Sequence, residues 1–193
     1  MKTTVFTIGI KLKKNSQIIL KENGIEKSSN YLKKNLKKIK NPSERILFDM
    51  ANLSKSFKKY SEAIKYYNKI LPKLKSDSST YAYVLYRRGS AFERLGDYVK
   101  SDKDLLKSLE VEPDDAYVLN YLAYSWLERN YKIDAAMQML KKAYELEPED
   151  AFIIDSIGWA YYLTENYIKA EKFLKEAIQI MPDDPIVNDH YGD

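Results

Sequence analysis

Residues 154–182, IDSIGWAYYLTENYIKAEKFLKEAIQIMP, decide the fold of this chain, because their pattern also occurs twice upstream. Two large residues, a small one and an aromatic one recur at helical spacing, followed by a small and a large residue four apart and then a proline. The copies read Leu85-x2-Arg88-Gly89-x2-Phe92…Ser101-x3-Leu105…Pro113, Leu119-x2-Leu122-Ala123-x2-Trp126…Ala136-x3-Leu140…Pro148 and Ile154-x2-Ile157-Gly158-x2-Tyr161…Ala170-x3-Leu174…Pro182. The prolines are 35 and 34 residues apart. A period of this length is typical of stacked helical hairpins.

Each copy of the pattern predicts one helical hairpin. Asp150 precedes an apolar run of helical period and is a natural N-cap, and Glu149 beside it adds negative charge at the helix N-terminus. Gly158 is the small residue of the first helix, so we expect the second helix to approach most closely there. Arg88 stands where the other copies have a large apolar residue, and we expect it to weaken the contact between its two helices.

This combination of spacing and residue types resembles the tetratricopeptide repeat (TPR). The resemblance implies an all-α fold, a right-handed superhelical solenoid of helix-turn-helix repeats. Such a repeat cannot bury its apolar face alone, so it stacks on its neighbours and presents a surface rather than a catalytic pocket. Residues 82–193 also look like long bacterial TPR scaffold proteins, some of which are exported and act as adaptors in envelope complexes.

The pattern divides the chain into predicted segments. Residues 82–115, 116–150 and 151–184 are the clear repeats. Residues 44–81 form a degenerate repeat with an inserted loop, residues 22–43 form the basic helix of a partial repeat, and residues 1–21 stay unassigned. Residues 185–193 begin a further, truncated repeat, so we expect the parent array to continue beyond Asp193.

The composition excludes several kinds of site and contains a charge asymmetry. The chain has no cysteine, which rules out disulfides and thiolate sites. Its net charge of +4 combines a basic part, with 19 Lys and Arg against 5 Asp and Glu in residues 1–75, and an acidic part, with 13 against 23 in residues 76–193.

No apolar run approaches the ~18 residues of a membrane span, and no signal peptide is visible. We therefore expect a soluble protein, cytoplasmic or periplasmic.

Little in the sequence supports catalysis or a cofactor. His190 is the single histidine, and we expect it to be a surface residue in the first turn of a helix. The six glycines form no nucleotide-binding loop. The paired acids Asp114-Asp115 and Asp183-Asp184 fall where helices need N-caps, so we interpret them as caps and not as metal ligands. We predict a protein that is not an enzyme and carries no cofactor or metal.

The aromatic residues divide into two sets by their place in the repeat. The first set holds packing positions within or between hairpins: Tyr60, Phe92, Tyr98, Trp126, Tyr161 and Tyr167. The resemblance places a second set on the other face of each first helix, which lines the concave groove in the family. The residues that we predict to bind a partner there are Asn52, Tyr83, Tyr86, Tyr117, Asn120, Tyr124, Phe152, Asp155, Trp159 and Tyr162.

This groove set predicts the function. Tyr and Trp are preferred at interaction surfaces, and groove asparagines in the family commonly bond a peptide backbone, so we predict a scaffold that binds a peptide or partner protein. The alternative is that these rings only pack between neighbouring first helices. Binding of chaperone tails is disfavoured, because aromatics such as Phe48 and Tyr117 occupy positions where a carboxylate clamp needs a cation.

The basic N-terminal region suggests a different function. Five lysines surround an apolar helical stripe of Ile25, Leu32, Leu36 and Ile39; they are Lys33, Lys34, Lys37, Lys38 and Lys40. Such a helix could dock on an anionic membrane surface or on nucleic acid, although no Arg-rich reading helix or stacking motif accompanies it. A basic half facing an acidic half could also drive head-to-tail self-association.

Overall fold

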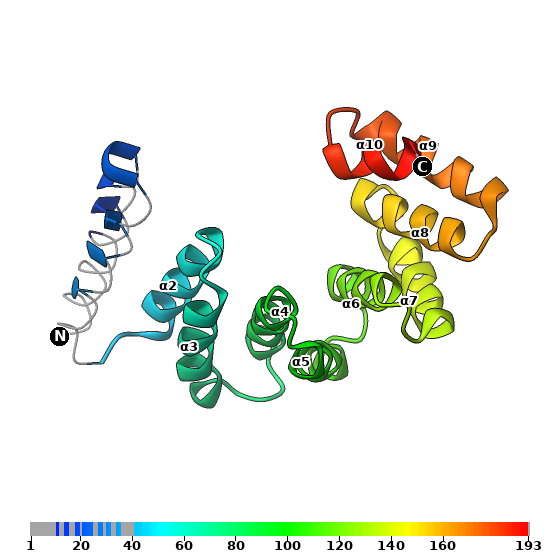
Figure 1. Ribbon diagram of the computed structural model, residues 1–193. Helices are drawn as coiled ribbons and strands as arrows, with labels where there is room; N and C mark the ends of the chain where they lie inside the picture. The colour runs from blue at the N-terminus through cyan, green and yellow to red at the C-terminus, as the bar shows by residue number, and fades with distance from the viewer. Residues whose placement is uncertain are drawn as a thin grey trace. The chain divides into compact units, whose positions relative to one another are not determined.

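The computed structural model describes residues 41–192 and, before them, residues 11, 14, 15, 18, 19, 21–24, 27, 28, 30, 31, 34 and 35. Every regular element in this described part is a helix, which confirms the predicted all-α fold (Figure 1). Residues 1–21 lie mostly outside it and residues 22–43 are described only in part, so both predicted segments stay predictions. The chain forms two compact units, Met1–Asp104 (unit 1) and Leu105–Asp193 (unit 2).

Unit 1 contains two helical hairpins in its described part. Its elements are α2 (Glu44–Ser56), α3 (Tyr60–Ile70), the short 3-10 helix η1 (Leu71–Lys73), α4 (Ser79–Glu93) and the first half of α5 (Tyr98–Val111). Ser43 and Ser78 begin α2 and α4 as N-caps, because each hydroxyl accepts the backbone N–H three residues on. The extra residues between α3 and α4 form η1 and the turn before Ser78.

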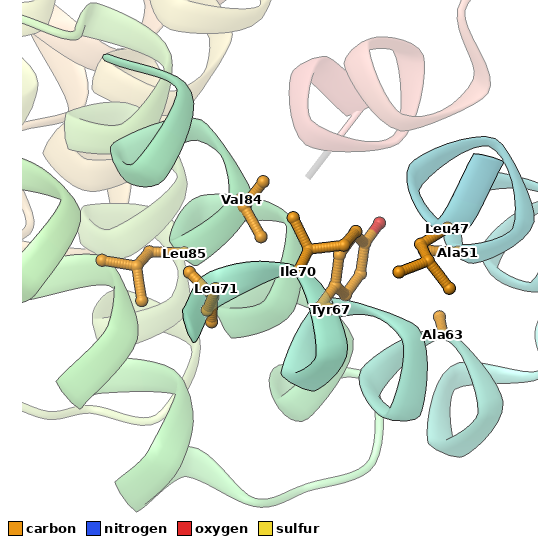
Figure 2. Packing of buried hydrophobic residues seen from close by; sticks show 8 residues of the cluster. All are labelled: Leu47, Ala51, Ala63, Tyr67, Ile70, Leu71, Val84 and Leu85. Carbon is orange, nitrogen blue, oxygen red and sulfur yellow. The ribbon is translucent and has the colours of Figure 1, made fainter. Parts of the chain in front are cut away.

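The core of unit 1 surrounds Tyr67, whose side chain is fully buried (Figure 2). It joins α2, α3 and α4 through Leu47, Ala51, Ala63, Tyr67, Ile70, Leu71, Val84 and Leu85. Ala51 on α2 and Ala63 on α3 are the small members of this cluster. Burying an aromatic ring of this size is among the largest single apolar contributions to a small core.

Arg88, which we expected to weaken its hairpin, forms an ion pair with the second helix. Its Nε and Nη2 donate to both carboxylate oxygens of Asp104 at 2.6 and 2.7 Å, and its Nη1 donates to Asn68 Oδ1 at 2.7 Å. In the repeat register, Asp104 aligns with Met139 and Phe173, and Arg88 aligns with apolar residues too. An apolar contact between the two helices has been replaced by a bidentate ion pair, which is the strong form of this interaction.

Unit 2 continues with the same hairpin arrangement. It contains the rest of α5, then α6 (Ala116–Glu128), α7 (Ile133–Leu146), α8 (Ala151–Leu163), α9 (Tyr167–Ile180) and α10 (Pro185–Gly192). Helix α8 contacts both α6 and α10, so these three first helices form one layer, while α7 and α9 are the second helices of their hairpins. We call the outer surface of the α6, α8 and α10 layer the first-helix face of unit 2.

Three aspartates begin the first helices of unit 2. One carboxylate oxygen of Asp115 accepts the N–H groups of Tyr117 and Val118, Asp150 accepts those of Phe152 and Ile153, and Asp184 accepts those of Ile186 and Val187. All six distances lie between 2.9 and 3.2 Å. The interpretation of the acidic pairs as caps is therefore confirmed.

The two helices of the α8–α9 hairpin approach each other tightly at Gly158. A Cβ atom added there would sit 2.8 Å from Cγ and Cδ2 of Leu174 and 3.0 Å from its backbone nitrogen. Real Cβ atoms essentially never come so close to another heavy atom. The absence of a side chain at residue 158 thus sets the distance between the two helices.

Two of the predicted packing aromatics are more exposed than we expected. Trp126 is buried, with 4% of its surface exposed, but Tyr98 and Tyr167 are 39% and 60% exposed. Each of the two tyrosines is the first residue of a second helix. The ring of Tyr167 still contacts the ring of Tyr162 on α8, at a centroid distance of 5.9 Å.

Within the described residues, no helix combines the length and apolar character needed to cross a bilayer.

Candidate functional site

The predicted groove residues belong to both units, and each unit is described by itself. Unit 1 holds Asn52 on α2 and Tyr83 and Tyr86 on α4. Unit 2 holds the other seven, on α6 and α8: Tyr117, Asn120, Tyr124, Phe152, Asp155, Trp159 and Tyr162.

In unit 1, Asn52 is engaged by neighbouring side chains. Its Oδ1 accepts the hydroxyl of Tyr67 at 3.2 Å and Nη2 of Arg87 at 3.0 Å. The amide oxygen that we predicted to bind a peptide backbone is thus held within the protein. Tyr83 is 46% exposed and has ring contacts with Phe48 and Tyr86, at centroid distances of 5.7 and 6.3 Å.

A cationic cluster in unit 1 was missed by the sequence reasoning. Lys55 Nζ donates to Ser90 Oγ across the α2–α4 contact. Burial, followed by the charges of Arg87 and Arg94, lowers the pKa of Lys55 to about 8, against a smaller opposing effect of Glu93. Lys55 lies more than 30 residues before Arg87 and Arg94, and the three cations differ in repeat position. No single sequence motif therefore marks this cluster.

The first-helix face of unit 2 carries a row of exposed apolar side chains. Tyr117, Phe152 and Ile186 are 55%, 53% and 59% exposed. Each lies two residues after a capping aspartate, so one large side chain is held at the same position at the start of each first helix. Ile186 was not in the predicted set, although the repeat register places it in line with Phe152.

Further along the same helices, Trp159 lies within a stack of rings. Its indole packs on Tyr162 at 5.1 Å and 20°, and on the imidazole of His190 at 4.3 Å and 12°. Its Nε1 donates to Glu128 Oε1 at 3.0 Å, which links α8 to α6. Two neighbouring rings therefore stack on this indole, as the packing alternative describes.

His190 is not the surface residue that we expected. It is 7% exposed, its Nδ1 lies 2.8 Å from Asp155 Oδ2, and its Nε2 lies 3.5 Å from the hydroxyl of Tyr124. The sequence signal was available: one repeat earlier the same position is Ser156, which is also buried. Burial alone would lower the pKa of His190, but the hydrogen bond and charge of Asp155, with smaller effects of Glu128 and Asp189, raise it above its ordinary value.

The buried polar atoms of this face are only partly satisfied. Asp155 is 4% exposed, and its Oδ1 has no hydrogen-bond partner, in contrast to its Oδ2. Oδ1 of Asn120 is also buried without a partner. The predicted set in unit 2 therefore comprises two exposed rings, one buried acid and, between them, half-buried Asn120, Tyr124, Trp159 and Tyr162.

Two family models match the sequence. The SusR N-terminal TPR domain matches residues 12–109, and the tetratricopeptide repeat matches residues 155–184. The first match covers more than half of the chain, and the helical hairpins agree with it. The chain belongs to the TPR family. No curated protein matches it.

Solved TPR structures share the fold of this TPR protein. A TPR protein from Parabacteroides merdae has a TM-score of 0.74 and 20% identity, and the alignment covers 97% of this chain and 72% of that one. MamA from Desulfovibrio magneticus has a TM-score of 0.69 and 17% identity, and the alignment covers 92% of this chain and 97% of MamA. YrrB is described as a TPR protein with an unusual peptide-binding site. It has a TM-score of 0.63 and 18% identity, and the alignment covers 94% of this chain and 91% of YrrB. At these identities the likeness establishes the fold.

The predicted basic helix of this TPR protein lies mostly outside the described part. The apolar stripe of the basic helix and four of its five lysines are among the residues left undescribed, and Lys34 is exposed. Over the described residues, no group of three or more His, Asp and Glu side chains is placed to hold a metal ion.

Proposed function

We propose that this TPR protein is a non-enzymatic interaction scaffold that binds a peptide or a partner protein on the first-helix face of unit 2. The partner would lie across α6, α8 and α10, with Tyr117 and Phe152 as its main contacts. Tyr124, Trp159 and Tyr162 form the half-buried floor behind them.

The observation that carries this proposal is the exposure of Tyr117 and Phe152 at the same position on two contacting helices. Single exposed apolar residues are ordinary, but a regular row of them is typical of a surface that another molecule covers. Rigid aromatic side chains give a large contact area at a low cost in side-chain entropy, which is why they dominate binding energy at interfaces. The capping hydrogen bonds hold each ring at its position before a partner arrives.

The fold also supports a protein partner. Stacked TPR hairpins offer an extended surface, and YrrB, with the same fold, is described as having a peptide-binding site.

The proposal is tested with the double variant Tyr117→Ser and Phe152→Ser. The matched control is Ile168→Ser, because Ile168 is 86% exposed on the second helix α9 of the same unit. Proteins from a lysate of the source cells are captured on each immobilised full-length chain and quantified by mass spectrometry. Partners retained by the wild type and by the control should be lost from the double variant. Equal capture by all three chains, with unchanged circular dichroism, would show that this row of rings binds nothing.

A further inference from the structure

Negative side chains outnumber positive ones on the first helices of unit 2. Within the bounds of α6, α8 and α10 there is no Lys or Arg, and the carboxylates are Glu128, Asp155 and Asp189. The second helices of the same unit differ, since α7 and α9 carry five lysines: Lys141, Lys142, Lys169, Lys172 and Lys175. The acidic character therefore belongs to the face that presents the exposed rings and not to the whole unit.

More carboxylates lie at the edge of this face where the exposed rings are. Asp115, Asp150 and Asp184 cap the three helices, and each precedes an exposed apolar side chain by two residues. Glu147 and Glu149 lie just before the second cap and are exposed. The positive end of each helix dipole offsets part of the charge of its cap, but it does not offset the acids that precede the cap.

Two titratable groups on this face report its negative potential. The charges of Asp150 and then Glu147 raise the pKa of the Tyr117 phenol. The pKa of His190 is raised although burial acts in the opposite direction, because Asp155, Glu128 and Asp189 surround it. The two groups lie on α6 and α10, so the potential extends over the layer of first helices. A buried carboxylate oxygen without a donor, Oδ1 of Asp155, contributes to it from below.

We propose that the partner bound on the first-helix face of unit 2 is a cationic segment, a peptide stretch whose Lys or Arg residues alternate with apolar ones. The apolar side chains would contact Tyr117, Phe152 and Ile186, and the cations would lie beside the capping carboxylates and over the exposed ring faces. A cation over a Tyr or Phe ring is attracted by the π system, and the long stems of Lys and Arg cover apolar surface while their heads stay in water.

An acidic segment fits this face poorly. It would bring carboxylates toward Glu128, Asp189 and Glu147, and no Lys or Arg lies within the bounds of α6, α8 and α10 to receive them. Like charges placed together at an interface suppress the wrong partner. This inference rests on the proposed function and specifies the chemistry of its partner.

The test uses a fluorescent synthetic peptide in which lysine alternates with leucine, and a second peptide with glutamate in place of each lysine. Binding to the full chain is followed by fluorescence anisotropy. The neutralised variant carries Glu128→Gln, Glu147→Gln and Asp150→Asn. These changes keep a hydrogen-bond acceptor for the indole of Trp159 and a good N-cap for α8, so they remove charge without removing contacts.

The matched control removes three charges from the second helices, through Glu145→Gln, Glu171→Gln and Glu176→Gln. The lysine peptide should bind the wild type and the control alike, bind the neutralised variant about tenfold more weakly, and lose affinity with added salt. Binding of the glutamate peptide as tight as that of the lysine peptide would overturn the inference. An equal loss in the neutralised variant and the control would overturn it as well, because net charge and not this face would then attract the peptide.

One further measurement distinguishes a partner peptide from a second copy of this chain, and another distinguishes the cationic partner from the scaffold function. If sedimentation of the wild type without peptide shows salt-sensitive dimers that the neutralised variant does not form, a second copy of this chain is the occupant and the partner peptide is rejected. If cellular partners are lost from the Tyr117→Ser and Phe152→Ser variant but retained by the neutralised variant, the scaffold function stands and the cationic partner does not.

Discussion

Nδ1 of His190 and Oδ2 of Asp155 lie 2.8 Å apart and join α10 to α8. Both side chains are almost fully buried, and the imidazole also stacks on Trp159. Because the pKa of His190 is raised in the folded protein, its protonated form is bound more strongly there than in the unfolded chain. The stabilisation is complete below the ordinary value of 6.5 and is lost as the pH rises through the higher folded pKa.

We therefore expect His190→Gln to lower the melting temperature more at about pH 6 than at about pH 9. Comparing the wild type with the variant at each pH removes the effect of the other titrating groups. Hydrogen exchange should show the loss in α10 and the end of α8 first. A difference between the two proteins that stays constant with pH would show that His190 acts only by packing.

Gly158→Ala should destabilise the α8–α9 hairpin. Overpacking of this kind costs about 1–3 kcal/mol, of which the better helix propensity of Ala returns up to about 1 kcal/mol. Gly192→Ala is the control, because a Cβ at Gly192 meets no atom within 4 Å. Urea unfolding followed by circular dichroism measures both. A Gly158→Ala protein as stable as the control variant would mean that α9 shifts without cost.

A double-mutant cycle measures the interaction energy between Arg88 and Asp104. Arg88→Leu leaves the buried Asp104 carboxylate without its cation and should cost about 2–4 kcal/mol. Adding Asp104→Met restores the apolar pair that the other repeats have at these positions and should recover most of the loss. If both proteins are equally destabilised, the site does not accept the apolar packing seen at the equivalent positions of unit 2.

Trp126 and Tyr117 should differ sharply although both are aromatic residues of α6. Trp126→Ala empties a buried site and should cost about 3–5 kcal/mol. Tyr117→Ala removes an exposed ring and should change stability by no more than about 0.5 kcal/mol. Thermal melts of the two variants check this. Equal destabilisation would place Tyr117 in the core and remove it from the candidate interaction surface.

The lowered pKa of Lys55 has a consequence for stability at alkaline pH. Between about pH 8 and 10.5 the unfolded chain holds this proton more tightly than the folded protein, so this group makes stability rise with pH in that range. The melting temperature of the wild type relative to Lys55→Met should therefore increase from pH 8 to pH 10. Lys65→Met, at an exposed lysine of α3, is the matched control for the loss of a lysine. A flat difference for Lys55→Met would contradict the lowered pKa.

The sequence was sufficient for the hairpins, their boundaries at the acidic caps and the close approach at Gly158. These features depend on residues near one another in the chain: a cap and the N–H groups two or three residues later, or a small residue in a periodic apolar stripe. A repeat also states the same information several times. The family and the all-α fold follow from that redundancy, even where one copy is degenerate.

Only the tertiary structure decided which members of the candidate surface are exposed. The periodicity assigns Tyr117, Asp155 and Trp159 to one face, but His190 of the next repeat bonds to the buried Asp155 and stacks on Trp159. The same holds for Arg88, whose compensating partner is 16 residues away on the other helix of its hairpin. Burial and charge compensation depend on which side chains meet across helices, and a helical period gives the direction of a side chain but not its neighbour.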